Sequence, residues 1–182
     1  MIFTKDSIDQ LVYVKQSMRK EVFLTDSFKA CLRPYQVEGF TFLESMSRYG
    51  IGCVLADDMG LGKTIQILAL LVANKQVTDS TSLVCSPASV LHVWENEAKK
   101  FAPELRTVIC HGSLAKRQKI LNNIADYDLI ITSYGSARND VDLLLKYEFD
   151  SILLDEAQHI RNPKTKAYQA IRRLKGRMRI AI

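Results

Sequence analysis

The chain has 182 residues, of which 47% are hydrophobic, and it carries a formal net charge of +5 at pH 7. This length suits one α/β domain with a core of its own, and no apolar run reaches the roughly 18 residues that a membrane-spanning helix requires. Lys5, Asp6 and Asp9 interrupt the N-terminal stretch, which excludes an apolar signal core there. We therefore expect an intracellular protein without a membrane partner, in the cytoplasm or nucleoid of a bacterium or the nucleus of a eukaryote.

The cysteines and the distribution of charge further narrow the possible class of protein. None of the 4 cysteines forms a C-x-x-C pair, which argues against a zinc ribbon or a redox motif and fits a reducing compartment. All 20 acidic residues lie at or before Glu156, whereas residues 161–179 contain eight Lys or Arg residues and no acid. Such a basic end is either a nucleic-acid-binding face or a solvated helix face, and composition alone leaves both interpretations open.

The sequence predicts a helical lead-in over residues 1–27 and one domain over residues 28–182. Within the domain, short runs rich in Val, Ile and Leu alternate with segments long enough to be helices. Strands that alternate with helices indicate parallel βαβ units, and continuous apolar runs indicate strands buried on both faces. The expected strands are 53–56, 82–86, 106–110, 128–132, 151–154 and 179–182.

Three helical segments carry further predictions. Pro34 suits a first helical turn, and Gly50 ends the segment that follows it. The helix after Pro87 has an apolar stripe, which we interpret as core rather than as a ligand site: Val90, Trp94, Ala98 and Phe101. A later helix has three basic residues on a face that we interpret as solvated, although it could line a nucleic-acid path: Lys116, Arg117 and Lys119.

The strongest chemical signal is the loop A-D-D-M-G-L-G-K-T at 56–64, between an apolar strand and an apolar helix. Strand, glycine-bearing loop, Gly-Lys-Thr and helix form the context of a P-loop, in which Gly60 and Gly62 let backbone N–H groups curl around phosphate oxygens. Lys63 would reach the β- and γ-phosphates, and the Thr64 hydroxyl would hold Mg²⁺. The general pattern expects glycine at position 57, where this chain has aspartate.

Two adjacent carboxylates complete the expected site. Asp155 and Glu156 follow a buried strand, and ligands of open parallel sheets bind at the carboxyl edge of the strands. Asp155 would hold Mg²⁺, and Glu156 would act as the general base that polarises the attacking water. Without nucleotide, we expect Lys63 either to hold an anion in the loop or to turn toward a carboxylate.

Several motifs in order resemble the SWI/SNF-like ATPases of helicase superfamily two, over residues 28–182. The loop at 56–64 resembles the family's A-D-E-M-G-L-G-K-T and differs only at Asp58. L-R-P-Y-Q-V-E-G at 32–39 resembles the Q-motif, and residues 86–91 with Trp94, Glu97 and 101–103 resemble motif Ia. His111-Gly112 matches a short family signature. Thr132-Ser133-Tyr134, with Arg138 and Asp140, resembles motif Ib, and D-E-A-Q-H-I-R-N at 155–162 resembles the Walker B box.

The resemblance implies a RecA-like fold, with a mainly parallel sheet flanked by helices on both faces, and ATP with Mg²⁺ as ligands. Gln36 would read the adenine edge, and Gln158 would couple the site to movement. Lys63, Asp155 and Glu156 would be catalytic, with Thr64 and Asp155 holding the metal. The implied nucleotide contacts are Arg33, Gln36, Asp58, Met59, Gly60, Leu61, Gly62, Lys63, Thr64 and Ile65. The implied contacts to DNA phosphates, each of which is equally well interpreted as a helix cap or turn residue, are Ser86, Ser89, Ser133 and Tyr134.

The function implied by the resemblance is ATP-driven translocation on double-stranded DNA, with remodelling or displacement of DNA-bound proteins. Residues 179–182 resemble the opening of the motif III strand, so we expect a first RecA-like lobe that lacks the second lobe and its arginine fingers. We expect this lobe alone to be nearly inactive, and its partners to be the second lobe, duplex DNA and a DNA-bound protein. In this fold the last strand lies between the P-loop strand and the Walker B strand, parallel to both.

Two alternatives are kept. The first is an RNA helicase lobe, against which the loop at 57–61 argues. The second is a nucleotide-binding scaffold that does not hydrolyse, against which the intact Lys63, Asp155 and Glu156 argue. Stimulation of ATP hydrolysis by duplex DNA or by RNA distinguishes the first alternative from the DNA motor.

Overall fold

The computed structural model describes residues 28, 30–58 and 60–182, so the helical lead-in expected over 1–27 and the predicted contact Met59 lie outside the described residues. The centre of the molecule is a six-stranded sheet in the order β1-β6-β5-β2-β4-β3, in which every neighbouring pair is parallel. The strands are β1 (Cys53–Val54), β2 (Ser82–Ser86), β3 (Thr107–Cys110), β4 (Leu129–Ser133), β5 (Glu148–Leu154) and β6 (Lys175–Ala181).

The predicted position of the last strand is confirmed. β6 lies between β1 and β5, and its Ile180 pairs with Cys53 on one side and Leu153 on the other. β5 and β6 begin at Glu148 and Lys175, before the apolar runs that predicted them at 151 and 179. Glu148 and Lys175 are partners in the ladder, so pairing between the strands continues into polar residues that carry no strand signal of their own.

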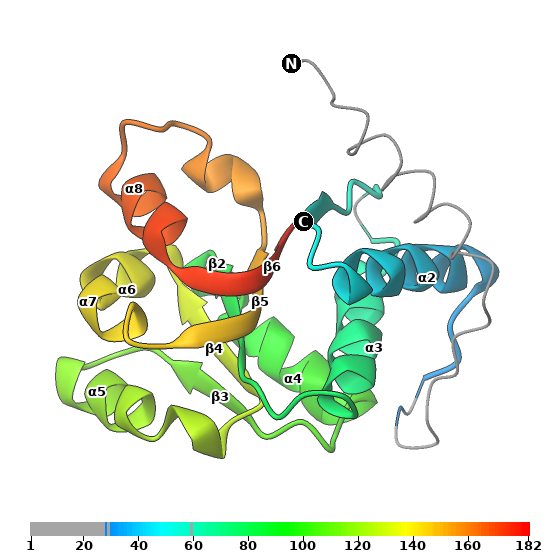
Figure 1. Cartoon of the computed structure of the whole chain (residues 1–182), viewed down its shortest axis with the longest axis horizontal. Coiled ribbons are helices and arrows are strands. Elements are labelled where there is room, and N and C mark those ends of the chain that lie inside the picture. The colour runs from blue at the N-terminus through cyan, green and yellow to red at the C-terminus, as the bar shows by residue number, and fades with distance from the viewer. Residues whose placement is uncertain (1–27, 29, 59) are drawn as a thin grey trace.

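Helices cover both faces of the sheet, as Figure 1 shows, and the predicted fold class is confirmed. One face is covered by α2 (Pro34–Arg48), α3 (Lys63–Lys75) and α4 (Leu91–Phe101). The other face is covered by α5 (Leu114–Asn122), α6 (Tyr134–Asn139), α7 (Val141–Leu144) and α8 (Lys166–Arg173). The described part of the chain also has three short 3-10 turns: η1 (Ala88–Val90), η2 (Ile124–Asp126) and η3 (Ala157–Ile160). Within the described residues, no helix combines the length and apolar character needed to cross a membrane.

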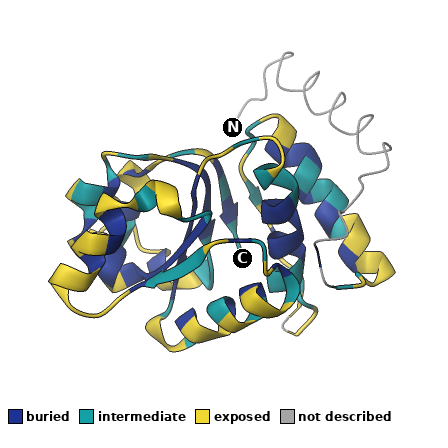
Figure 2. Ribbon diagram, turned by 90° about the horizontal axis from the view of Figure 1, so that it is seen from below, coloured by how far each residue is buried: buried dark blue, intermediate teal, exposed yellow. Residues whose placement is uncertain are grey.

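Each face of the sheet buries its own hydrophobic cluster, because consecutive side chains of a strand point to opposite faces. In β2, Val84 packs in the cluster with α2, α3 and α4, whereas Leu83 and Cys85 pack in the cluster with α5 to α8. The strands in the middle of the sheet are therefore buried throughout, as their dark blue colour in Figure 2 shows. Burial raises the pKa of the Cys85 thiol to about 12, so this cysteine serves as a small hydrophobic side chain.

Two predictions about helix faces have different outcomes. The predicted stripe is core at Trp94 and Ala98, which are buried, and Phe101 packs half-buried against the same cluster, whereas Val90 lies in the η1 turn before α4. The prediction of a solvated face on α5 is wrong for Arg117, which is buried: its Nε donates to Asp140 Oδ2 at 2.5 Å and its Nη2 donates to Asp140 Oδ1 at 2.9 Å. Asp140 lies 23 residues further along, between α6 and α7, so the periodicity of α5 could not indicate this ion pair.

Asp128 joins three elements at the amino edge of the sheet. Its carboxylate accepts hydrogen bonds from Lys75 Nζ at the end of α3 (2.6 Å) and from Arg106 Nη2 just before β3 (2.6 Å). Burial by itself would raise the pKa of Asp128, but the hydrogen bonds from Arg106 and Lys75 outweigh burial and lower the pKa to about 2. Asp128 therefore stabilises the fold above its ordinary pKa of 3.8, and this contribution is lost as the pH falls toward about 2.

We expect Asp128→Asn to lower the free energy of unfolding at neutral pH by about 1–2 kcal/mol, allowing for solvent screening of the half-exposed Arg106. Urea unfolding of both proteins at neutral pH and near pH 2 measures the difference, which should shrink at acid pH because the wild-type carboxylate is then protonated. Asp126→Asn, at a neighbouring exposed acid, is the control. A difference of equal size at both pH values would contradict the assignment.

Candidate functional site

A loop joins β1 to α3 at the carboxyl edge of the sheet. Gly60 and Gly62 in this loop both have positive φ, at 83° and 77°, and α3 begins directly after Gly62. A Cβ on Gly62 would lie 2.6 Å from Gln36 Nε2, so both the backbone conformation and the close approach require glycine there. The loop thus has the tightly curved backbone that can surround a phosphate group at a helix N-terminus.

Lys63, the first residue of α3, is folded back onto this loop. Its Nζ donates to the carbonyl oxygens of Asp57 at 2.5 Å and Asp58 at 3.1 Å. The predicted turn of Lys63 toward a carboxylate is therefore wrong, because the curved loop presents its carbonyls to the ammonium group. The Asp57 carboxylate accepts instead from Gln66 Nε2 at 3.0 Å. A phosphate that enters the loop would have to draw Lys63 away from these two carbonyls.

Gln36 connects α2 to the loop. Its Oε1 accepts from the backbone N–H of Arg33 at 2.9 Å, and its Nε2 donates to the carbonyl of Leu61 at 3.0 Å. Each function of the amide thus has one partner within the protein, which leaves a second Nε2 hydrogen and a second Oε1 lone pair for the adenine that the resemblance implies. Asp58 and Leu61 are exposed at the surface of the loop, whereas Ile65 packs against the hydrophobic cluster below it.

The two predicted carboxylates follow β5 directly. Glu156 is the only described residue other than glycine with positive φ, at 53°. Its Oε2 accepts a hydrogen bond from Gln158 Nε2, which comes from the η3 turn. A left-handed conformation costs such a residue of order 1 kcal/mol or more, and strain of this kind occurs mainly where a side chain must point in one direction for function.

Asp155 is held on two sides. Trp94 Nε1 on α4 donates to its Oδ2 at 2.8 Å, and the Tyr134 hydroxyl on α6 donates to its backbone carbonyl at 2.8 Å. Burial raises the pKa of the Asp155 carboxyl above its ordinary value, and the hydrogen bond from Trp94 opposes this rise. The positive charge of Lys63 also favours the ionised carboxylate, which places the two halves of the site next to each other.

Glu97 on α4 lies near the loop half of the site. Burial raises the pKa of its carboxyl, and the neighbouring Thr64 side chain opposes that rise. The Thr64 hydroxyl and the Asp155 carboxylate fit Mg²⁺, because this hard cation takes oxygen ligands and is commonly bound through one or two carboxylates. The sequence predicted Trp94 as a core residue and a motif position and Glu97 only as a motif position, so their place beside the site was missed. The available signal was their spacing of three residues, which puts them on one face of a helix.

The four residues expected to contact DNA do not share one environment. Ser86, Ser133 and Tyr134 are buried, and Ser133 caps α6 by accepting from the backbone N–H of Ser136 at 3.1 Å. The interpretation of Ser133 as a helix cap is therefore the one that the structure supports. Ser89, in the η1 turn after β2, is exposed, and it is the one of the four whose side chain a phosphate can reach in this structure.

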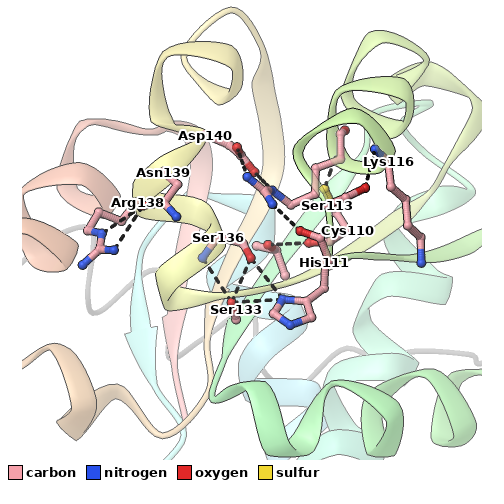
Figure 3. Close-up of polar contacts among 12 residues, drawn as sticks. Cys110, His111, Ser113, Lys116, Ser133, Ser136, Arg138, Asn139 and Asp140 are labelled. Atoms are coloured by element: carbon pink, nitrogen blue, oxygen red, sulfur yellow. Dashed lines mark hydrogen bonds and ion pairs between the residues drawn. The ribbon is translucent and has the colours of Figure 1, made fainter.

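Exposed nitrogen-bearing side chains surround the ends of β3 and β4 (Figure 3). Lys116 lies in the first turn of α5, and Arg138 lies in the last turn of α6. His111 follows β3 directly, and its Nδ1 is 3.1 Å from the Ser136 hydroxyl. β1, which leads into the loop, is at one end of the strand order, and β4 and β3 are at the other end, after β5 and β2. These side chains therefore occupy the other half of the same sheet edge.

The insertion of β6 between the P-loop strand and the strand that leads to Asp155 is the arrangement expected of a RecA-like lobe, and this is the class of protein that the fold defines. Residues 35–182 match the family described as SNF2-related domain. The chain belongs to this family, which confirms the resemblance drawn from the motifs.

Similar proteins occur in all three domains of life. YwqA of Bacillus subtilis, provisionally named an ATP-dependent helicase/translocase, is 41% identical over 164 residues, covering 87% of this chain and 18% of YwqA. The TATA-binding protein-associated factor MOT1 of Saccharomyces cerevisiae is 32% identical over 191 residues, covering 98% of this chain and 10% of MOT1. The SWI2/SNF2 ATPase core of Sulfolobus solfataricus, solved in complex with dsDNA, has a TM-score of 0.79 and 43% identity, covering 88% of this chain and 34% of that one. The chain thus spans a small part of the curated relatives and about a third of the solved ATPase core.

Proposed function

We propose that this chain is the ATP-binding lobe of a DNA-dependent ATPase that translocates on double-stranded DNA and remodels or displaces proteins bound to it. The observation that carries the proposal is the meeting of two segments at one edge of the sheet: the loop with Lys63 and Thr64, and the end of β5 with Asp155 and Glu156. Together they supply the ammonium group, the hydroxyl and the carboxylates that ATP hydrolysis uses.

Each of these residues has its own task in the proposed reaction. The loop N–H groups and Lys63 bind and orient the phosphates of ATP. Thr64 and Asp155 would hold Mg²⁺, which supplies positive charge beside the phosphates when it is bound. Glu156 orients the attacking water and accepts its proton, and Gln158 holds the Glu156 carboxylate through the hydrogen bond to Oε2.

Recognition of adenine by Gln36 can use the remaining capacity of its amide. Nε2 carries two hydrogens and Oε1 has two lone pairs, and the bonds to the Leu61 carbonyl and the Arg33 N–H use one of each. We propose that the second hydrogen and the second lone pair bind the base, while the bond to Leu61 links Gln36 to the loop. Gln36 would then respond to the base and to the loop conformation together.

Duplex DNA is the proposed track. The similar ATPase core from Sulfolobus solfataricus was solved with dsDNA, and the exposed Ser89, Lys116 and Arg138 offer donors for phosphate oxygens at the same sheet edge. The test is ATP hydrolysis by a protein that contains both lobes, with duplex DNA or with duplex RNA of equal length. We expect stimulation by DNA. Stronger stimulation by RNA would support the RNA helicase alternative, and no hydrolysis under any condition would support the scaffold.

Lys116→Ala is expected to weaken binding to duplex DNA equally for all sequences. It should also reduce the slope of log affinity against log salt by about 1, because one phosphate contact releases about one counterion. Fluorescence anisotropy of a labelled duplex at several salt concentrations measures both effects. The matched control is Lys146→Ala, an exposed lysine that precedes β5 at the opposite edge of the sheet. Identical slopes for the two variants would remove Lys116 from the DNA path.

A further inference from the structure

One helix reaches both halves of the proposed magnesium site. Trp94 and Glu97 lie one turn apart on α4, and neither belongs to the P-loop or to the segment after β5. Trp94 donates a hydrogen bond to the Asp155 carboxylate, and Thr64 is near enough to Glu97 to oppose the rise that burial causes in the pKa of the Glu97 carboxyl. Asp155 and Thr64 are the two residues proposed above as ligands of Mg²⁺, so one face of α4 lies beside both.

The contact from Trp94 restricts the Asp155 carboxylate. The indole is 2% exposed and packs in the cluster with Leu91 and Ala98, so its position is set by the core. A buried indole N–H needs a hydrogen-bond partner, and the partner here is Asp155 Oδ2 at 2.8 Å. Because the ring cannot move without disturbing the core, the N–H holds Asp155 Oδ2 in place and leaves Oδ1 for another partner.

The Glu97 carboxylate can complement this effect at the neighbouring Thr64 hydroxyl. A hydroxyl has one proton and two lone pairs. A Thr64 hydroxyl that turns its proton toward the Glu97 carboxylate leaves its lone pairs for another partner, and a cation is the partner that suits them. Glu97 also places a second carboxylate near Asp155, which adds to the negative potential at the site.

We propose that Trp94 is a positioning residue that sets the affinity of this lobe for Mg²⁺ by holding Asp155 in the orientation the cation requires, and that Glu97, one turn further along the same helix, adds to this affinity through its charge. The inference rests on the proposed function, since it assumes that nucleotide and Mg²⁺ bind at this edge. Groups that hold metal ligands in place commonly contribute 10–100-fold to metal affinity. The helix that carries part of motif Ia is thereby part of the nucleotide site, in addition to its place in the core.

The first test measures the Mg²⁺ dependence of ADP binding to the 182-residue chain by calorimetry, with MgCl₂ and ADP as the ligands. Trp94→Phe replaces the indole with a smaller aromatic ring that has no N–H, and Glu97→Gln keeps the shape and removes the charge. We expect each variant to need about 10-fold more Mg²⁺ than wild type for half-maximal ADP binding, with ADP binding unchanged at saturating Mg²⁺. Glu95→Gln, on the same helix but facing His92 and Lys99, should titrate like wild type.

The second test uses tryptophan emission, since Trp94 is the only tryptophan of the chain. Adding MgCl₂ with ADP should change the emission of wild type in a saturable way, and Asp155→Asn should lose that response. If Trp94→Phe does not fold, the Glu97→Gln titration and the emission of wild type decide the question. The inference would be overturned, with the proposed function unaffected, by either of two results. The first is that Trp94→Phe and Glu97→Gln titrate with Mg²⁺ like wild type, and the second is that the emission does not change with Mg²⁺ while ADP binds. Absence of Mg²⁺-dependent ADP binding in wild type would overturn the proposed function as well.

Discussion

Glu156→Gln should lower the rate of ATP hydrolysis by about 10²–10⁴-fold in a protein that contains both lobes, because the amide can no longer accept the proton of the attacking water. The substitution keeps the length and shape of the side chain, so the left-handed backbone at this position is retained. The phosphates are bound by the loop and Lys63 in the proposed reaction, and these groups are unchanged. Affinity for ATP should therefore stay within a few fold of wild type.

Steady-state phosphate release and equilibrium ATP binding, measured on the same preparations, separate the two effects. Glu148→Gln, an exposed acid at the start of β5, is the matched control and should leave both quantities unchanged. Hydrolysis that survives Glu156→Gln would remove Glu156 from its role as base. Equal losses of binding and hydrolysis would instead assign it to nucleotide binding.

The 182-residue chain by itself should hydrolyse ATP close to the uncatalysed rate, with or without duplex DNA. The described site contains Lys63, Thr64, Asp155 and Glu156, whereas the resemblance assigns the arginine fingers and the opposite wall of the nucleotide cleft to a second lobe. An arginine finger contributes about 10³–10⁵-fold in comparable NTPases. We also expect weak binding of ATP and of duplex DNA, because half of each set of contacts would come from that second lobe.

This expectation is measured by phosphate release from the chain and from a protein with both lobes, each with and without duplex DNA. The positive control is DNA-stimulated hydrolysis by the two-lobe protein. A second measurement, ADP binding by calorimetry, shows whether the chain retains its nucleotide site. Rapid, DNA-stimulated hydrolysis by the chain alone would show that the site needs no second lobe.

Much of the fold and of the candidate site could be predicted from local sequence patterns. Continuous apolar runs located the six strands, because strands of a parallel sheet are buried on both faces. The loop at 56–64 and the carboxylates at 155–156 located both halves of the site, because each half is formed by consecutive residues whose chemistry is visible in the sequence. The family resemblance added the position of β6, which the strand pairing confirms.

The partners of individual side chains were decided by the tertiary structure. Lys63 donates to two loop carbonyls instead of a carboxylate, and Arg117 is buried against Asp140 instead of being solvated. Helical periodicity indicates which face of a helix is buried, but it carries no information about the residue that the face will meet. The stripe on α4 therefore predicted that Trp94 is core. Its hydrogen bond to Asp155, 61 residues further along the chain, exists only because packing on the sheet brings α4 against the end of β5.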